Sequence, residues 1–206
     1  MKHFYEDLFQ KSLKNIIRGE KIINKNIANE SFDKQLLWLS ARRFISHAKS
    51  IIYLCDRKQN LEALMLLRPI IELVVNLRWI IEDKIGANRQ QFIKSTDYKF
   101  SNGIPEMGGY WSDKNLLERM KTIGFSQKYY NMVISKLHEE LHVNPAVIAR
   151  AYSRDLTSMD SEAIFSVACQ FVGHLLKVAN GVYPNKYFMN HDDVWNKIKV
   201  STTKEN

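Results

Sequence analysis

Three polar residues interrupt the most apolar stretch of the chain, Leu61–Ile81. Arg68, Glu72 and Asn76 follow one another at intervals of four residues, so on a helix they form one line. A glutamate that binds an arginine holds the guanidinium plane in place, and that plane pairs well with phosphate oxygens. The row therefore suits phosphodiester cleavage or nucleotide binding. The alternative is an intrahelical Arg–Glu pair with a structural role only.

A histidine and an asparagine in the turn LHVNPA can complete such a site. His142 and Asn144 follow the row by about seventy residues, and a histidine transfers protons near neutral pH. We expect this turn to approach the row. Arg68, Glu72 and His142 are then the catalytic candidates, and Asn76 and Asn144 are contacts for the substrate.

The segment RRFISH holds a second Arg–His pair. Arg42 and His47 are five residues apart, which places them about 140° from each other on a helix. They therefore cannot face one phosphate together, whereas Arg43 and His47 share a face. We expect Arg43 and His47 to contact the substrate. The alternative places His47 at the edge of the core and leaves the arginines in solvent.

The residues His138-Glu139-Glu140-Leu141-His142 spell the HExxH motif of zinc peptidases. There the two histidines bind the metal and the glutamate activates a water molecule. The context here is poor, because Glu140 adds a charge and Pro145 ends the helix within a turn. We therefore predict no metal and no other cofactor, and keep a zinc hydrolase using His138, Glu139 and His142 as an alternative.

Helical spacing of apolar residues recurs along the whole chain, and no useful length of strand-like alternation interrupts it. The sequence predicts an all-α, up-and-down bundle of four to five long helices plus short ones. Pro69 should kink the central helix, Ser126 should cap a helix, and Gly124 should end another. The expected helices cover residues 2–28, about 31–55, 61–81, 87–100, 113–123, 126–142, about 160–180 and 192–200.

Length and composition indicate one soluble domain. The chain has 206 residues, with a core bundle expected at about 31–180, outer helices at 2–28 and 184–200, and a frayed tail at 201–206. A formal charge of +8 favours an acidic partner, nucleic acid first. Cys55 and Cys169 suit free thiols in a reducing cytoplasm. The charges within 61–81 oppose membrane insertion by about 2.5–3.5 kcal/mol each, so we predict no membrane contact.

The segment from Ser40 to Trp79 resembles a family of uncharacterised prokaryotic all-helical proteins. Its L-x-R-x-x-x-E pattern corresponds here to Leu66, Arg68 and Glu72, with His142 as the later histidine. Such proteins resemble HEPN domains, in which an arginine and a histidine act on RNA across a dimer interface.

The resemblance implies a HEPN-like bundle, a homodimer, and a role in a defence or toxin–antitoxin module as a metal-independent ribonuclease. The chain departs from active HEPN ribonucleases because no R-x4-6-H begins a C-terminal helix. The alternative is a non-catalytic interaction or antitoxin-type module that binds a protein partner.

Overall fold

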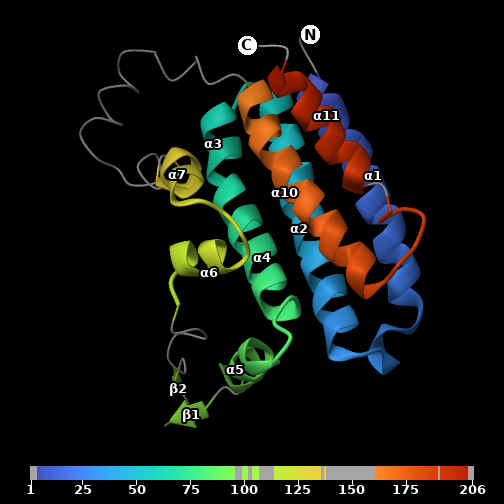
Figure 1. The fold of residues 1–206 in the computed structure, drawn as a ribbon, viewed down its shortest axis with the longest axis vertical. Helices are drawn as coiled ribbons and strands as arrows, with labels where there is room; N and C mark the ends of the chain where they lie inside the picture. The colour runs from blue at the N-terminus through green and yellow to red at the C-terminus, as the bar shows by residue number, and fades with distance from the viewer. Residues whose placement is uncertain are drawn as a thin grey trace.

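The computed structural model describes residues 4–95, 99–101, 104–106, 114–135, 137, 161–189 and 191–203 (Figure 1). The fold is all-α, as predicted, and carries one additional short hairpin. Its elements in chain order are α1 (Phe4–Ile23), the 3-10 helix η1 (Asn24–Asn29), α2 (Phe32–Asp56), α3 (Asn60–Met65), α4 (Leu67–Ile81), α5 (Ala87–Ser95), β1 (Lys99–Ser101), β2 (Ile104–Glu106), α6 (Leu116–Thr122), α7 (Gln127–Tyr130), the π-helical turn η2 (Asn131–Ser135), α10 (Ser161–Val182) and α11 (His191–Thr203).

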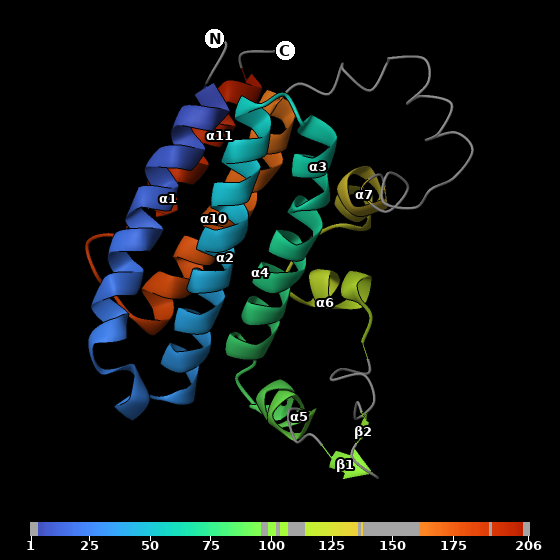
Figure 2. The same cartoon turned by 180° about the vertical axis from the view of Figure 1, so that it is seen from behind.

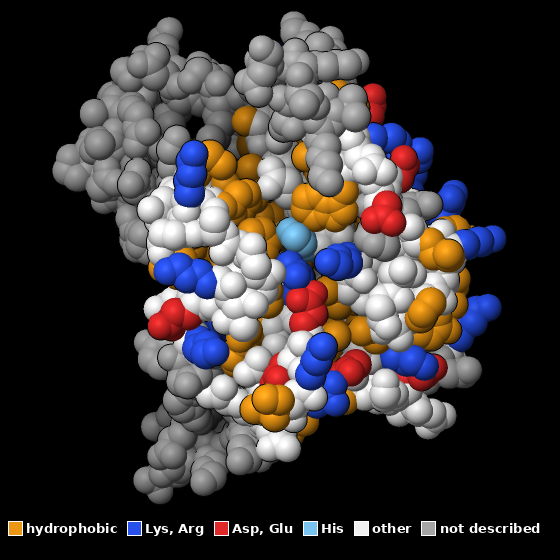
Figure 3. All heavy atoms as spheres, in the orientation of Figure 1, with side chains coloured by type: hydrophobic (Ala, Val, Ile, Leu, Met, Phe, Trp, Pro, Cys, Tyr) orange, Lys and Arg blue, Asp and Glu red, His pale blue; other side chains and the backbone are white. Residues whose placement is uncertain are grey.

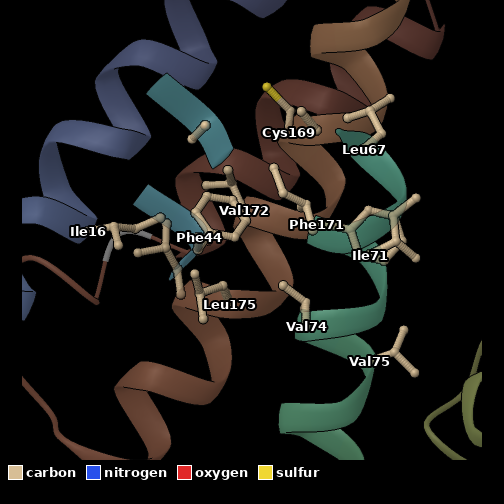
Figure 4. Close-up of a cluster of buried hydrophobic side chains, with 14 of the residues drawn as sticks. Ile16, Phe44, Leu67, Ile71, Val74, Val75, Cys169, Phe171, Val172 and Leu175 are labelled. Carbon is tan, nitrogen blue, oxygen red and sulfur yellow. The ribbon is translucent and has the colours of Figure 1, made fainter. Parts of the chain in front are cut away.

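Four long helices, α1, α2, α4 and α10, lie side by side and enclose the core (Figures 1 and 2). Each contributes large apolar side chains that are excluded from water, because apolar residues recur at helical spacing on its inner face. Figure 4 shows the centre of this core, where Ile16 of α1, Phe44 of α2, Val74 of α4 and Val172 of α10 converge. α11 packs on α10, and α6 packs on the side of α4.

The helix directions correct the predicted up-and-down order. α1, α2 and α4 alternate in direction, but α10 runs parallel to α1 and α4 (Figure 1). The backbone N–H of Tyr5, at the start of α1, donates to Glu162 at the start of α10 over 2.9 Å. At the other end, one pocket is lined by Glu82, Gly181 and Ser31, from the ends of α4 and α10 and the start of α2. α10 therefore starts at the end of the bundle where α1 starts and runs in the same direction as α4.

The predicted central helix is interrupted near Pro69, where only a kink was predicted. α3 ends at Met65 and α4 begins at Leu67, with Leu66 between them. Pro69 is the third residue of α4, where backbone N–H groups have no acceptor within their own helix. The missing N–H therefore costs no hydrogen bond inside α4, and the stretch predicted as one kinked helix consists of two.

Helix boundaries elsewhere differ in several places from the sequence-based expectation. The last helix, α11, extends to Thr203, so the first three residues of the predicted frayed tail 201–206 are helical. The first helix ends at Ile23 and continues as the 3-10 helix η1. The helix predicted over 87–100 ends at Ser95, because residues 99–101 pair with 104–106 in an antiparallel hairpin. α10 continues through Asn180 and Gly181 to Val182, two residues before Pro184, so the proline rather than the glycine marks its end.

Two capping signals read from the sequence are present. The hydroxyl of Ser126 accepts from the backbone N–H of Tyr129 and starts α7. Gly124 directly follows Ile123, the C-cap of α6, and its φ of +94° marks the end of that helix. α7 gives way to the π-helical η2 after one turn, and of the later positions in the predicted 126–142 helix only residue 137 is described.

α10 is also the one helix among the described residues that is long and apolar enough to cross a membrane, judged by length and composition alone. In the structure 61% of the apolar stretch is buried inside the protein, as in the core helix of a bundle. α4, at 15 residues, does not meet the same criteria.

Gly19 allows α1 to approach the segment after α10 closely. A methyl group added at Gly19 would overlap the ring of Phe188, which is 1% exposed. We expect Gly19→Ala to lower the free energy of unfolding by about 1–3 kcal/mol, because a packed aromatic ring must move. Urea denaturation followed by circular dichroism measures this.

Gly181→Ala is the matched control in a second helix. A methyl group there meets no heavy atom of the described chain within 4 Å beyond its own helix neighbours. It should leave the stability unchanged or raise it by up to about 1 kcal/mol through helix propensity. Equal effects of the two substitutions would contradict the close contact at Gly19.

Candidate functional site

The predicted polar row lies on the outward side of α4. Arg68 Nε donates to Glu72 Oε1 over 2.9 Å, and the two side chains are 32% and 39% exposed. Asn76 is half-buried one turn further on, and its Oδ1 has no hydrogen-bond partner among the described residues. The Arg–Glu pair predicted from the spacing is therefore present, and solvent reaches both of its members.

α6 adds a second arginine that sequence analysis missed. Asn115 and Glu118 form a capping box that starts α6, and the helix packs on α4. Burial lowers the pKa of the next residue, Arg119, and the nearby carboxylate of Glu72 opposes that shift. Two guanidinium groups thus lie near the carboxylate of Glu72. The sequence shows the short helix but not that it packs on α4.

The remaining members of the predicted site lie outside the described residues. This holds for His142 and Asn144, proposed for proton transfer and substrate contact, and for His138 and Glu139 of the zinc alternative. No cluster of three or more potential metal-binding side chains occurs within the described ranges. The structure therefore places Arg68, Glu72 and Asn76 together and leaves their predicted partners untested.

The second predicted pair, Arg43 and His47, lies on α2. Arg43 is exposed, while His47 is half-buried and its Nε2 atom is buried without a hydrogen-bond partner in the described chain. Burial, followed by the positive charge of Arg43, lowers the pKa of His47. His47 is therefore neutral near pH 7. Arg42 lies instead over the ring of Trp38, 4.9 Å from its centre, and its Nε is 4.0 Å from Glu20 Oε1.

A buried cluster joins the far end of α4 to α10. The side chain of Arg78 is 7% exposed and binds Glu82 twice, over 2.8 and 2.9 Å. Its Nη1 lies 3.1 Å from Nδ1 of His174. The i,i+4 spacing of Arg78 and Glu82 is visible in the sequence, but the partner on α10, 96 residues later, is not.

His174, the partner of Arg78, lies among aromatic side chains. The rings of Phe125 and Trp195 each lie 4.7 Å from the imidazole, edge to face. Burial, with Arg78 and then Lys177 adding positive charge, lowers the pKa of His174 to about 3. Arg78 can only donate, so Nδ1 accepts and Nε2 carries the proton. A neutral histidine with this pKa is a hydrogen-bond partner, not a proton acceptor at neutral pH.

The face that contains this cluster mixes both signs of charge. In the space-filling view, basic and acidic side chains alternate around a histidine, with apolar side chains between them (Figure 3). Glu82 pairs with Arg78, and Asp33 pairs with Arg89 over 2.7 Å. We therefore assign this cluster a structural role, in contrast to the solvent-accessible row around Glu72.

His174 makes the stability of the fold depend on pH. Between pH 6.5 and about 3 the unfolded chain binds a proton at this position and the folded chain does not. The free energy of unfolding therefore falls as the pH falls, by up to about 1.4 kcal/mol per unit. His174→Gln keeps an acceptor for Arg78 but cannot titrate. Urea denaturation at pH 7 and pH 5 should show a larger loss for the wild-type chain than for His174→Gln, and parallel losses would contradict this role.

Comparison with known proteins places part of this chain in context. Residues 34–108 match the family model "Family of unknown function (DUF5677)". The matched part contains Arg43, His47, Arg68, Glu72 and Asn76, and it ends before α6 and the LHVNPA turn. No curated protein and no solved structure matches the chain. The comparisons thus support an uncharacterised family, and the HEPN resemblance stays a prediction.

Proposed function

We propose that this protein binds RNA or a nucleotide through the polar row of α4, as a HEPN-like member of a prokaryotic defence or toxin–antitoxin module. The observation that carries the proposal is the solvent-accessible Arg68–Glu72 pair, with Arg119 close to the same carboxylate. Guanidinium groups that a carboxylate holds in place pair well with phosphate oxygens. The formal charge of +8 favours the same class of partner. A cytoplasmic location and a homodimer belong to the same proposal.

Each member of the row has a distinct task in this proposal. Arg68 donates to a phosphate oxygen, and Glu72 fixes the plane of the guanidinium group. Asn76 offers a side-chain amide one turn further along α4. His142 supplies proton transfer without a metal if the protein is a ribonuclease. Binding alone needs only the three residues on α4.

A non-catalytic interaction module is the second candidate, and exposed apolar side chains favour it. Three large examples are Tyr53, Met65 and Met132, with exposures of 57%, 42% and 55%. They belong to α2, α3 and η2. Apolar surface of this kind is typical of protein interfaces when it is contiguous.

Substitution at Arg68 separates the two candidates. We expect Arg68→Ala to weaken RNA binding about 10- to 100-fold, because a charge-assisted hydrogen bond to phosphate contributes about 1.5–3 kcal/mol. The fold should survive, since an exposed i,i+4 ion pair contributes only about 0.3–0.5 kcal/mol. Glu72→Gln keeps an acceptor for Arg68 and removes a negative charge, so it should bind RNA as tightly as the wild type or more tightly. Fluorescence anisotropy with a labelled oligonucleotide measures both.

Arg18→Ala is the control, because it removes one exposed arginine from α1. Equal losses for Arg18→Ala and Arg68→Ala would mean that overall charge, not the row, attracts RNA. A wild-type chain that binds no RNA and forms a complex with a protein partner would establish the interaction module instead.

A further inference from the structure

α2 carries charge of a single sign along most of its length. Between Asp33 and Asp56 it contains no acidic residue, whereas four basic residues occur there and another follows the helix directly: Lys34, Arg42, Arg43, Lys49 and Arg57. α4 and α11, in contrast, each carry acidic as well as basic residues within the helix. The outer surface of α2 therefore carries an excess of positive charge between its two ends.

Most of these charges share one face. Arg42, Arg43, Lys49 and Arg57 fall within a sector of about 120° at 100° per residue, and Tyr53 lies inside the same sector. All five are exposed. From Arg42 to Arg57 the face extends about 22 Å at 1.5 Å per residue. α2 lies toward the viewer between α1 and α4 in Figure 2. We call these five residues the basic face of α2.

The charges on this face are weakly paired within the described chain. Arg43 and Lys49 have no ion pair there, and Arg42 meets Glu20 only at 4.0 Å. Long cationic side chains without a carboxylate neighbour cost little to rearrange around phosphate groups. A polyanion thus gains attraction here without breaking a strong internal ion pair.

Flat surfaces are interleaved with these charges. Tyr53 is 57% exposed, and the guanidinium carbon of Arg57 lies 4.0 Å from the centre of its ring. Arg42 covers Trp38 in the same way at 4.9 Å. Aromatic rings and arginine planes stack on nucleic-acid bases, and only bases released from a duplex can reach them. The combination favours single-stranded RNA over a duplex and over an acidic protein.

We propose that the basic face of α2 is a second contact surface, which holds single-stranded RNA beside the α4 row. Arg42, Arg43 and Lys49 contact successive phosphates, and one base stacks on Tyr53 or on the outer plane of Arg57. The inference rests on the proposed function and extends it, because it names the class of RNA and the surface that guides it. The matched family segment contains all of these residues.

The test uses the full chain and a fluorescein-labelled single-stranded RNA of about 12 nucleotides. Arg43→Gln/Lys49→Gln should weaken binding about 10-fold or more at low salt. It should also reduce the slope of log affinity against log salt by about 1.4, at about 0.7 per phosphate contact. Lys177→Gln/Lys186→Gln is the matched control, because it removes the same charge from α10 and the segment after it.

Tyr53→Ser tests stacking separately from charge. It should weaken binding of the single strand about 5-fold or more and leave binding of a duplex of the same length unchanged. A matching loss for both nucleic acids would overturn the assignment to single-stranded RNA. Poly-glutamate provides a second test. If it binds as tightly as RNA and Tyr53→Ser does not weaken that binding, the basic face of α2 binds an acidic protein, and the assignment to single-stranded RNA is overturned.

The outcomes distinguish this inference from the proposal beneath it. If the wild-type chain binds no RNA, both the proposed function and this inference are refuted. If Arg68→Ala loses RNA while Arg43→Gln/Lys49→Gln behaves like the Lys177/Lys186 control, only the basic face of α2 is refuted. Circular dichroism of each variant confirms that the exposed substitutions leave the helices intact.

Discussion

α4 must exclude water from most of its circumference, and the rest of the fold follows from this requirement. α2, α10 and α6 cover it from three directions, and Ile71, Val75 and Trp79 are at most 2% exposed. Each fully buried side chain of this size contributes about 1.5–3 kcal/mol. Pro69 lies in the first turn of α4, where its missing N–H costs no hydrogen bond within the helix. A polar side chain on α4 is therefore tolerated in two situations. Either solvent reaches it, or buried partners satisfy its hydrogen bonds and charge.

Two arginines on α4 show both solutions to this requirement. Arg78 is buried, and Glu82 and His174 bind it from two helices, so its charge is compensated inside the protein. Arg68 lies ten residues earlier and keeps about a third of its side chain in solvent. The buried arginine ties α4 to α10. The accessible one is the group that can meet a ligand, and the same holds for Arg43 and Lys49 on α2.

Local signals in the sequence predicted the local structure well. Periodic apolar residues predicted the helices, Pro69 predicted a distortion of the central helix, and Ser126 and Gly124 predicted the start of one helix and the end of another, because each acts through its own backbone. The i,i+4 spacing likewise predicted the contact between Arg68 and Glu72. Contacts between distant segments could not be predicted in this way. The parallel direction of α10, the position of Arg119 beside Glu72 and the bond from Arg78 to His174 depend on how a long connection returns, which no short pattern encodes.

The central claim is that the Arg68–Glu72 pair is kept for a ligand and not for the fold. A double-mutant cycle of Arg68→Met, Glu72→Met and the combined variant tests it most directly, with the free energy of unfolding measured by urea denaturation. Our account predicts a coupling energy below about 0.5 kcal/mol and a double variant at least as stable as the wild type. A coupling of about 2 kcal/mol or more, with a clearly destabilised double variant, would contradict it and make the row part of the scaffold.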